Sequence, residues 1–81
     1  MDKTLGYLIE SISNYSDDKI SRIILNKVMN NQYISEEAFV RDLDEEEIEF
    51  LNKVLPDEIN YAMDGRDFKR VQQLNEVYEL L

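Results

Sequence analysis

Cysteine and histidine are both absent from this chain of 81 residues. Without cysteine the protein has no disulfide, no thiolate nucleophile and no cysteine ligand for zinc, so its fold must be held by packing alone. Without histidine it lacks the usual general base near neutral pH and the commonest protein ligand of transition metals. We therefore expect a protein that is not an enzyme, with no catalytic residue, no cofactor and no metal site.

Glycine and proline are scarce as well, with two residues and one residue. No stretch alternates in the manner of a strand rich in valine, isoleucine and threonine, so β structure has little support. No apolar run approaches the roughly 20 residues that span a bilayer. Residues 1–6 lack the basic and then apolar pattern that opens a secretory signal. We expect a cytoplasmic type of protein that does not enter a membrane.

Acidic residues outnumber basic ones by 18 to 9, which gives a net charge of −9. Such a charge repels phosphate backbones unless the bases are segregated, so nucleic acid is disfavoured as a partner. Hydrophobic residues make up 43% and charged residues 33%, as in folded globular proteins. The composition and length predict a single helical domain over residues 1–81, with the modest stability of a small core.

Apolar residues recur every three or four positions along the whole chain, which is the spacing of one face of a helix. The pattern predicts a first helix that ends at about residue 14, a second between about residues 16 and 30, a short third after residue 35, a long fourth between residues 44 and 65, and a terminal helix that runs to residue 81. Short connections between them imply mostly antiparallel neighbours. The sequence therefore predicts an all-α fold, a small bundle of four to five helices whose last two form an antiparallel hairpin.

Capping residues mark where these helices begin and end. Ser16 and Ser35 are predicted N-caps of the second and third helices. Asp44 is the predicted N-cap of the fourth, with Glu47 three residues later as in a capping box. Pro56 interrupts this helix with a kink or a break, and the apolar spacing continues across it, which favours a kink. Gly65 is a natural C-terminal stop.

The last helix carries an apolar stripe and three basic residues. The stripe is Phe68, Val71, Leu74, Tyr78 and Leu81. The bases lie at the start of the helix, against its dipole, so acids at the end of the fourth helix are expected to pair with them. The bases are Arg66, Lys69 and Arg70, and the acids are Asp57, Glu58 and Asp64. An exposed helix with these three bases would be the basis of an alternative function, association with nucleic acid, although the acidic composition argues against it.

The densest charged feature lies between residues 42 and 49, where six of the eight residues are acidic. Counted from Asp42, the sixth and twelfth positions of a calcium loop would be Glu47 and Lys53, so the EF-hand pattern is absent. The simplest interpretation is a solvated helix start. The hairpin would add two acids from the end of the last helix, making one acidic pole that could steer a basic partner. The predicted partner-binding residues are Asp44, Glu45, Glu46, Glu47, Glu76 and Glu79.

Four segments resemble a known family. They are TLGYL at residues 4–8, EEAFVRDLD at 36–44, FLNKVL at 50–55 and LNEVYELL at 74–81. The resemblance is to the CsgA family of sigma-G-dependent sporulation-specific proteins of spore-forming bacilli, and it runs nearly end to end. It implies synthesis in the forespore and residence in the spore core. The family bears the label small acid-soluble protein, but the chain does not resemble the DNA-coating α/β type, so no DNA binding is implied.

The resemblance carries no catalytic or ligand-binding motif. The leading hypothesis is therefore an acidic helical spore protein that is not an enzyme and acts through protein-protein contacts. Its expected partner is a basic protein or a second copy of itself, as a homo-oligomer.

Overall fold

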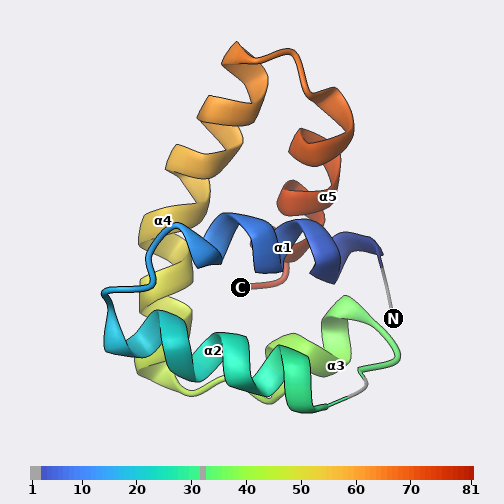
Figure 1. The fold of residues 1–81 in the computed structure, drawn as a ribbon. Coiled ribbons are helices and arrows are strands. Elements are labelled where there is room, and N and C mark those ends of the chain that lie inside the picture. Colours follow the sequence, from blue (N-terminus) through green and yellow to red (C-terminus); the bar gives the residue numbers. More distant parts are fainter. Residues whose placement is uncertain (1–2, 32) are drawn as a thin grey trace.

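Five helices joined by short connections make up the protein in a computed structural model that describes residues 3–31 and 33–81. The helices are α1 (Lys3–Ser13), α2 (Lys19–Asn30), α3 (Glu36–Arg41), α4 (Glu45–Asp64) and α5 (Phe68–Tyr78) (Figure 1). That part of the chain contains no strand. The predicted all-α fold is confirmed, although the last helix ends at Tyr78 and does not extend to Leu81 as predicted.

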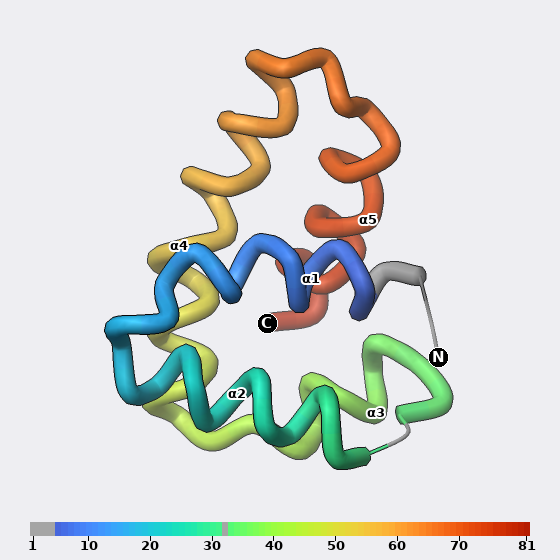
Figure 2. The backbone as a smooth tube through the Cα atoms, in the orientation of Figure 1, coloured from blue at the N-terminus to red at the C-terminus, as the bar shows by residue number. Residues whose placement is uncertain are grey.

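The arrangement is a hairpin with smaller helices packed on its lower half. α4 and α5 run in opposite directions and are joined by residues 65–67 at one end of the molecule, as predicted (Figure 1). α1 packs against α5 and α2, α2 packs against α4, and α3 packs against α5. The joined end of the hairpin projects beyond α1, and the chain after α5 turns back toward the centre (Figure 2). The hairpin tip therefore lies away from α1, α2 and α3 (Figure 2).

The core draws on every helix. It consists of Leu5, Leu8, Ile12, Ile24, Val28, Phe39, Leu43, Leu51, Leu55, Leu74 and Val77. Within α1 the buried residues recur at intervals of three and four, as the sequence predicts. Burial of these side chains supplies the main favourable free energy of folding in a chain with no disulfide.

Two of the three predicted N-caps are confirmed, and one is wrong. Ser35 accepts a hydrogen bond from the backbone N–H of Ala38, and Asp44 forms a capping box with Glu47. α2 is capped by Asp18 instead of Ser16, because residues 14–18 form hydrogen-bonded turns before the helix begins. The Asp18 carboxylate accepts from the N–H of Ile20 at 2.8 Å.

α4 continues through Pro56 as one helix of 20 residues, so the proline does not break it. Pro56 removes one backbone donor, but Leu51 and Leu55 before it and Ala62 after it are all buried on the same side. Packing on both sides of the proline keeps the two halves in one phase. Neither α4 nor any other helix in the described residues is long and apolar enough to cross a membrane.

The turn between α4 and α5 is a Schellman motif. The N–H of Arg66 bonds to the carbonyl of Met63 at 3.0 Å, and the N–H of Asp67 bonds to that of Ala62 at 2.9 Å. Gly65 stands where the helix ends, as predicted, but its φ is −83°. The residue in the left-handed region is Arg66, with φ of 57°. The turn therefore places an arginine where glycine is the usual choice.

The apolar stripe predicted for the last helix is partly wrong. Leu74 is fully buried, but Phe68 is 63% exposed and Tyr78 is 36% exposed. Val77 takes the inward position that the prediction gave to Tyr78. Phe68 is the first residue of α5, next to the turn that joins the hairpin. The helical spacing of apolar residues was predicted correctly. Which of these residues are buried depends on the neighbouring helices, which the spacing does not show.

Candidate partner-binding sites

Glu47, one of the predicted partner-binding acids in the first turn of α4, points into the protein. Glu47 accepts from the N–H of Asp44 at 2.8 Å, and Asp44 accepts from the N–H of Glu47 at 2.9 Å. Lys27 of α2 reaches the same Glu47 oxygen at 2.6 Å and also donates to the carbonyl of Asp42. The Glu47 side chain is 1% exposed. The structure therefore removes Glu47 from the predicted surface, because its carboxylate is used inside the protein.

The other acids of this segment stay on the surface, which we name the acidic start of α4. It comprises Asp42, Asp44, Glu45, Glu46 and Glu49, all exposed. Within residues 3–31 and 33–81, Lys27 and Arg70 are the bases that form ion pairs, and neither pairs with these five acids. The described residues bring together no group of three or more side chains that could hold a metal ion.

Asp42 is tied to the loop before α3. The hydroxyl of Tyr33 donates to its carboxylate at 2.6 Å. Burial of Tyr33 and this hydrogen bond raise the pKa of the tyrosine to about 12. The Tyr33 ring also meets Phe39 edge-on, at 5.5 Å between centroids. One end of the acidic start of α4 is therefore held in place by the core.

The two predicted acids of α5 lie elsewhere along the hairpin. With 11 residues against 20, α5 reaches roughly half the length of α4, at 1.5 Å per residue. Leu80 lies in a small pocket with residues of α3, so the end of α5 lies beside that helix. Glu79 is exposed and accepts from the Asn75 amide at 2.8 Å, and Glu76 is half-buried with an interaction of its own. A partner-binding role for these two residues stays a prediction.

One base of the predicted basic cluster, Arg70, pairs with different acids from those predicted. Arg70 meets Glu10 of α1 at 2.6 Å and Asp67 at 3.2 Å, in place of any acid of α4. Its guanidinium carbon lies 5.3 Å from the centroid of the Tyr7 ring. Burial acts to lower the pKa of Arg70, but the hydrogen bonds to Asp67 and Glu10 outweigh it and raise the pKa. Arg70 therefore links α5 to α1 through its ion pair with Glu10. Because its charge is used within the protein, one of the three bases on which the nucleic-acid hypothesis depends is no longer available.

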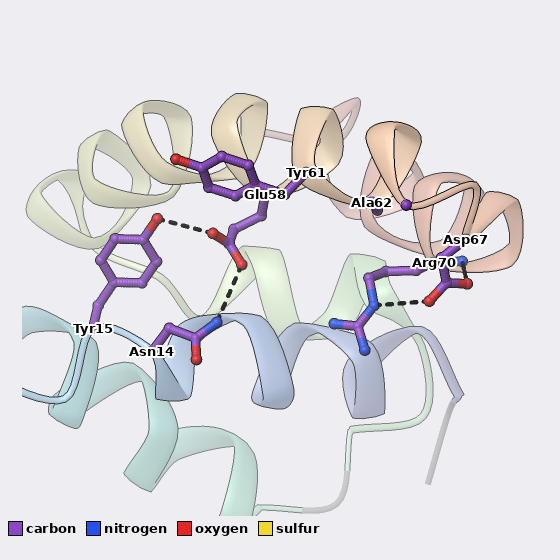
Figure 3. Close-up of a pocket in the computed structure, with 8 residues that line it drawn as sticks. Asn14, Tyr15, Glu58, Tyr61, Ala62, Asp67 and Arg70 are labelled. Carbon is purple, nitrogen blue, oxygen red and sulfur yellow. Dashed lines mark hydrogen bonds and ion pairs between the residues drawn. The ribbon is translucent and has the colours of Figure 1, made fainter.

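A pocket of about 670 Å³ lies between the end of α1 and the α4–α5 hairpin (Figure 3). Its lining residues are Asn14, Tyr15, Glu58, Tyr61, Ala62, Gly65, Asp67 and Arg70. They come from three segments of the chain that only the fold brings together. The sequence carried one signal of this pocket, because Glu58 lies three residues after Leu55 and so occupies an apolar phase of its helix.

Glu58 is 8% exposed, and its carboxylate is bound by neutral donors. The hydroxyl of Tyr15 donates to one oxygen at 3.0 Å, and the amide of Asn14 donates to the other at 3.5 Å (Figure 3). Burial and the bond to Glu58 raise the pKa of Tyr15 to about 12. The Tyr15 ring packs edge-on against Phe50, with 6.0 Å between centroids. The pocket therefore contains a buried negative charge and a phenol held in one position.

Comparison with known proteins supports the resemblance found in the sequence. The family model CsgA, described as minor curli fiber component A, matches residues 1–81. A Bacillus subtilis (strain 168) protein named sigma-G-dependent sporulation-specific SASP protein is 52% identical over 81 residues, which is 100% of this chain and 99% of that protein. No solved structure matches the chain.

The two descriptions differ, one naming a fibre component and the other a sporulation protein. Identity of 52% across both full chains makes the relative the better guide to the biological setting. The predicted family is therefore confirmed, and the chain belongs to the CsgA family, as a protein associated with sporulation.

Proposed function

We propose that the protein is a component of the spore interior, made in the forespore, that is not an enzyme and acts by binding a basic protein through the acidic start of α4. The setting rests on the name of the Bacillus subtilis relative, which states sigma-G dependence and sporulation specificity. The mode of action rests on the charge and geometry of the first turns of α4.

The observation that carries the proposal is five exposed carboxylates within eight residues, held on a fixed piece of backbone. The helix dipole stabilises acids in the first turn of α4, and its effect fades beyond that turn. The dipole explains why acids occur at Glu45 and Glu46. It does not explain the acids at Asp42, which precedes the helix, or Glu49, which lies in the second turn. An excess of acids beyond the needs of the helix favours recognition of positive charge.

A basic protein suits this surface better than a second copy of the chain. A two-fold symmetric interface built on it would place like charges against each other, at a cost in free energy. A net charge of −9 also repels nucleic acid. A partner rich in lysine or arginine would instead be drawn in at long range and would bind more weakly as salt rises.

Affinity capture from spore extract with two matched triple variants tests the proposal. One variant carries Glu45→Gln, Glu46→Gln and Glu49→Gln. The other carries Asp17→Asn, Glu37→Gln and Asp64→Asn, which removes the same number of exposed charges elsewhere. We expect a basic protein to be captured by the wild type and the second variant, to be lost with the first, and to be released by salt.

The captured protein would then be purified and titrated against all three chains by calorimetry at two salt concentrations. Equal affinity for the two triple variants would contradict the proposed surface. Capture that does not respond to salt, or that yields no basic protein, would contradict the proposed chemistry of the partner.

A further inference from the structure

α4 carries two buried acids on its apolar side, and they are compensated differently. Glu47 and Glu58 are both buried on the side of the helix that contains Leu51 and Leu55. The Glu47 carboxylate has a lysine ammonium at 2.6 Å. No ion pair of the described residues includes Glu58, whose donors are a phenol and an amide. Burying a carboxylate is costly unless its charge is compensated.

We propose that the pocket between the end of α1 and the α4–α5 hairpin binds an organic cation, a guanidinium or alkylammonium group, with the Glu58 carboxylate as its counter-ion. Each carboxylate oxygen accepts two hydrogen bonds. Tyr15 and Asn14 supply one to each oxygen, so one acceptor position remains on both (Figure 3). The two N–H groups of a guanidinium fork match such a pair of oxygens.

The remaining charges of the lining leave the pocket negative. Arg70 and Asp67 neutralise each other at 3.2 Å, and Arg70 is further paired with Glu10. The Glu58 charge is therefore left without a partner among the lining residues. Asp57 is exposed beside it on α4 and acts electrostatically on Tyr15 in the same direction as Glu58. A cation entering the pocket meets attraction from both carboxylates.

Tyrosine rings complete the match with a cation. Tyr15 and Tyr61 both line the pocket, and Tyr61 is 65% exposed. A cation over a tyrosine face is attracted by the negative face of the ring. The protein already makes this combination internally, where the Arg70 guanidinium bonds to the Glu10 carboxylate and lies over the Tyr7 ring. Glu58 and the two tyrosines line the pocket with the same kinds of groups, a carboxylate and phenol rings.

The pocket is of a size that suits a small molecule or a side chain with its flanking residues, since such sites measure about 300–1,000 Å³. Glu58 lies 12 residues after Glu46, roughly 18 Å along the axis of α4. The pocket is thus separate from the acidic start of α4, and its occupancy does not depend on the function proposed for that surface.

Nuclear magnetic resonance titration of the full chain tests the pocket directly. Nα-acetyl-arginine amide and Nα-acetyl-lysine amide represent protein side chains, and n-butylguanidinium represents a free small cation with the same single charge. Nα-acetyl-citrulline amide is the neutral isostere of the arginine probe. We expect saturable shifts at the amides of Tyr15, Glu58 and Tyr61 with a cation, and binding roughly tenfold weaker with citrulline, because a charge-assisted bond is lost. Tighter binding of a blocked amino acid than of n-butylguanidinium would assign the site to a protein side chain, and the reverse to a small molecule.

Three variants complete the test. Glu58→Gln keeps the shape of the side chain and should abolish saturable binding. Tyr61→Ala alters an exposed wall of the pocket and should weaken binding about two- to fivefold without disturbing the fold. Glu37→Gln, which removes one exposed charge on α3, should leave binding unchanged. The proposal is overturned if no cation saturates, if citrulline binds as well as arginine, or if Glu58→Gln binds like the wild type. Should Glu58→Gln not fold, unchanged binding by Tyr61→Ala would overturn it in the same way.

Discussion

Lys27 and Glu47, from α2 and α4, form an ion pair of 2.6 Å in which the glutamate side chain is 1% exposed and the lysine side chain 27% exposed. One carboxylate oxygen of Glu47 accepts from Lys27 and from the N–H of Asp44, and the other has no hydrogen-bond partner among the described residues. The ammonium group is therefore the charge that makes burial of Glu47 tolerable, and it fixes α2 against the start of α4.

Lys27→Met should lower the free energy of unfolding by about 2–4 kcal/mol, because it leaves a buried carboxylate without its cation. The range lies toward the lower end of such losses because Lys27 is partly exposed to solvent. Urea denaturation followed by circular dichroism measures the change. Lys53→Met places the same residue at an exposed position of α4 and should change stability by no more than about 0.5 kcal/mol.

The double variant Lys27→Met, Glu47→Gln separates loss of charge balance from loss of packing. Removing both charges should restore part of the stability that Lys27→Met loses, since glutamine keeps the acceptor for the N–H of Asp44. If the double variant were no more stable than Lys27→Met, the account of Glu47 as an acid that needs a cation would be wrong.

Arg66→Gly should raise the free energy of unfolding by about 0.5–1 kcal/mol. Arg66 adopts φ of 57°, where a residue with a β-carbon pays about 1–2 kcal/mol. Glycine avoids this cost but loses more backbone entropy on folding, so the gain is partial. Thermal or urea denaturation gives the change, and Arg66→Ala is the control because it removes the charge and keeps the β-carbon. A gain with alanine as large as that with glycine would trace the effect to the charge.

The sequence predicted the helices well because their signals are local. The apolar spacing placed all five helices, and the caps at Ser35 and Asp44 depend on residues within three positions of each other. The error at Ser16 is also local in size, a shift of two residues to Asp18. The position of Gly65 was correct, but the left-handed residue is the arginine after it. The preference for glycine at helix ends predicted the left-handed position at Gly65, but in this chain Arg66 adopts it.

The candidate sites were harder to predict because they depend on contacts between distant segments. The acids expected to pair with Arg70 were on α4, but its partners are Glu10 and Asp67. No spacing in the sequence shows that α1 packs against α5. Glu47 was counted with its exposed neighbours, although it lies four residues before Leu51, in the phase of the core. The phase of Glu47 and Glu58 in α4 was the available signal that both acids are buried.

Stability should fall as pH rises from 10 to about 12, because Tyr15 and Tyr33 both have pKa values raised to about 12 in the folded protein. Below pH 10 both states keep these protons, and the contribution of the tyrosines is constant. Above it the unfolded chain releases protons that the folded chain still holds, which favours unfolding. Urea denaturation at a series of pH values measures the decline, and Tyr15→Phe should make it shallower.

Spectrophotometric titration gives an independent check on the same pair. In the folded protein part of the tyrosinate absorbance should develop only toward pH 12, whereas in urea all five tyrosines should titrate near 10. Identical titration curves for the folded and unfolded protein would contradict the hydrogen bonds from Tyr15 to Glu58 and from Tyr33 to Asp42.

Leu74→Ala and Phe68→Ala should separate two residues that sequence spacing placed in one stripe. Leu74 is 0% exposed in the core, so its truncation should cost about 2–5 kcal/mol. Phe68 is 63% exposed at the hairpin tip, so its truncation should cost no more than about 0.5 kcal/mol although it removes more atoms. Urea denaturation of both variants measures the difference. Comparable losses would mean that the tip is covered in solution, and a loss confined to Leu74 would show that burial and not helical phase sets the energy of each position.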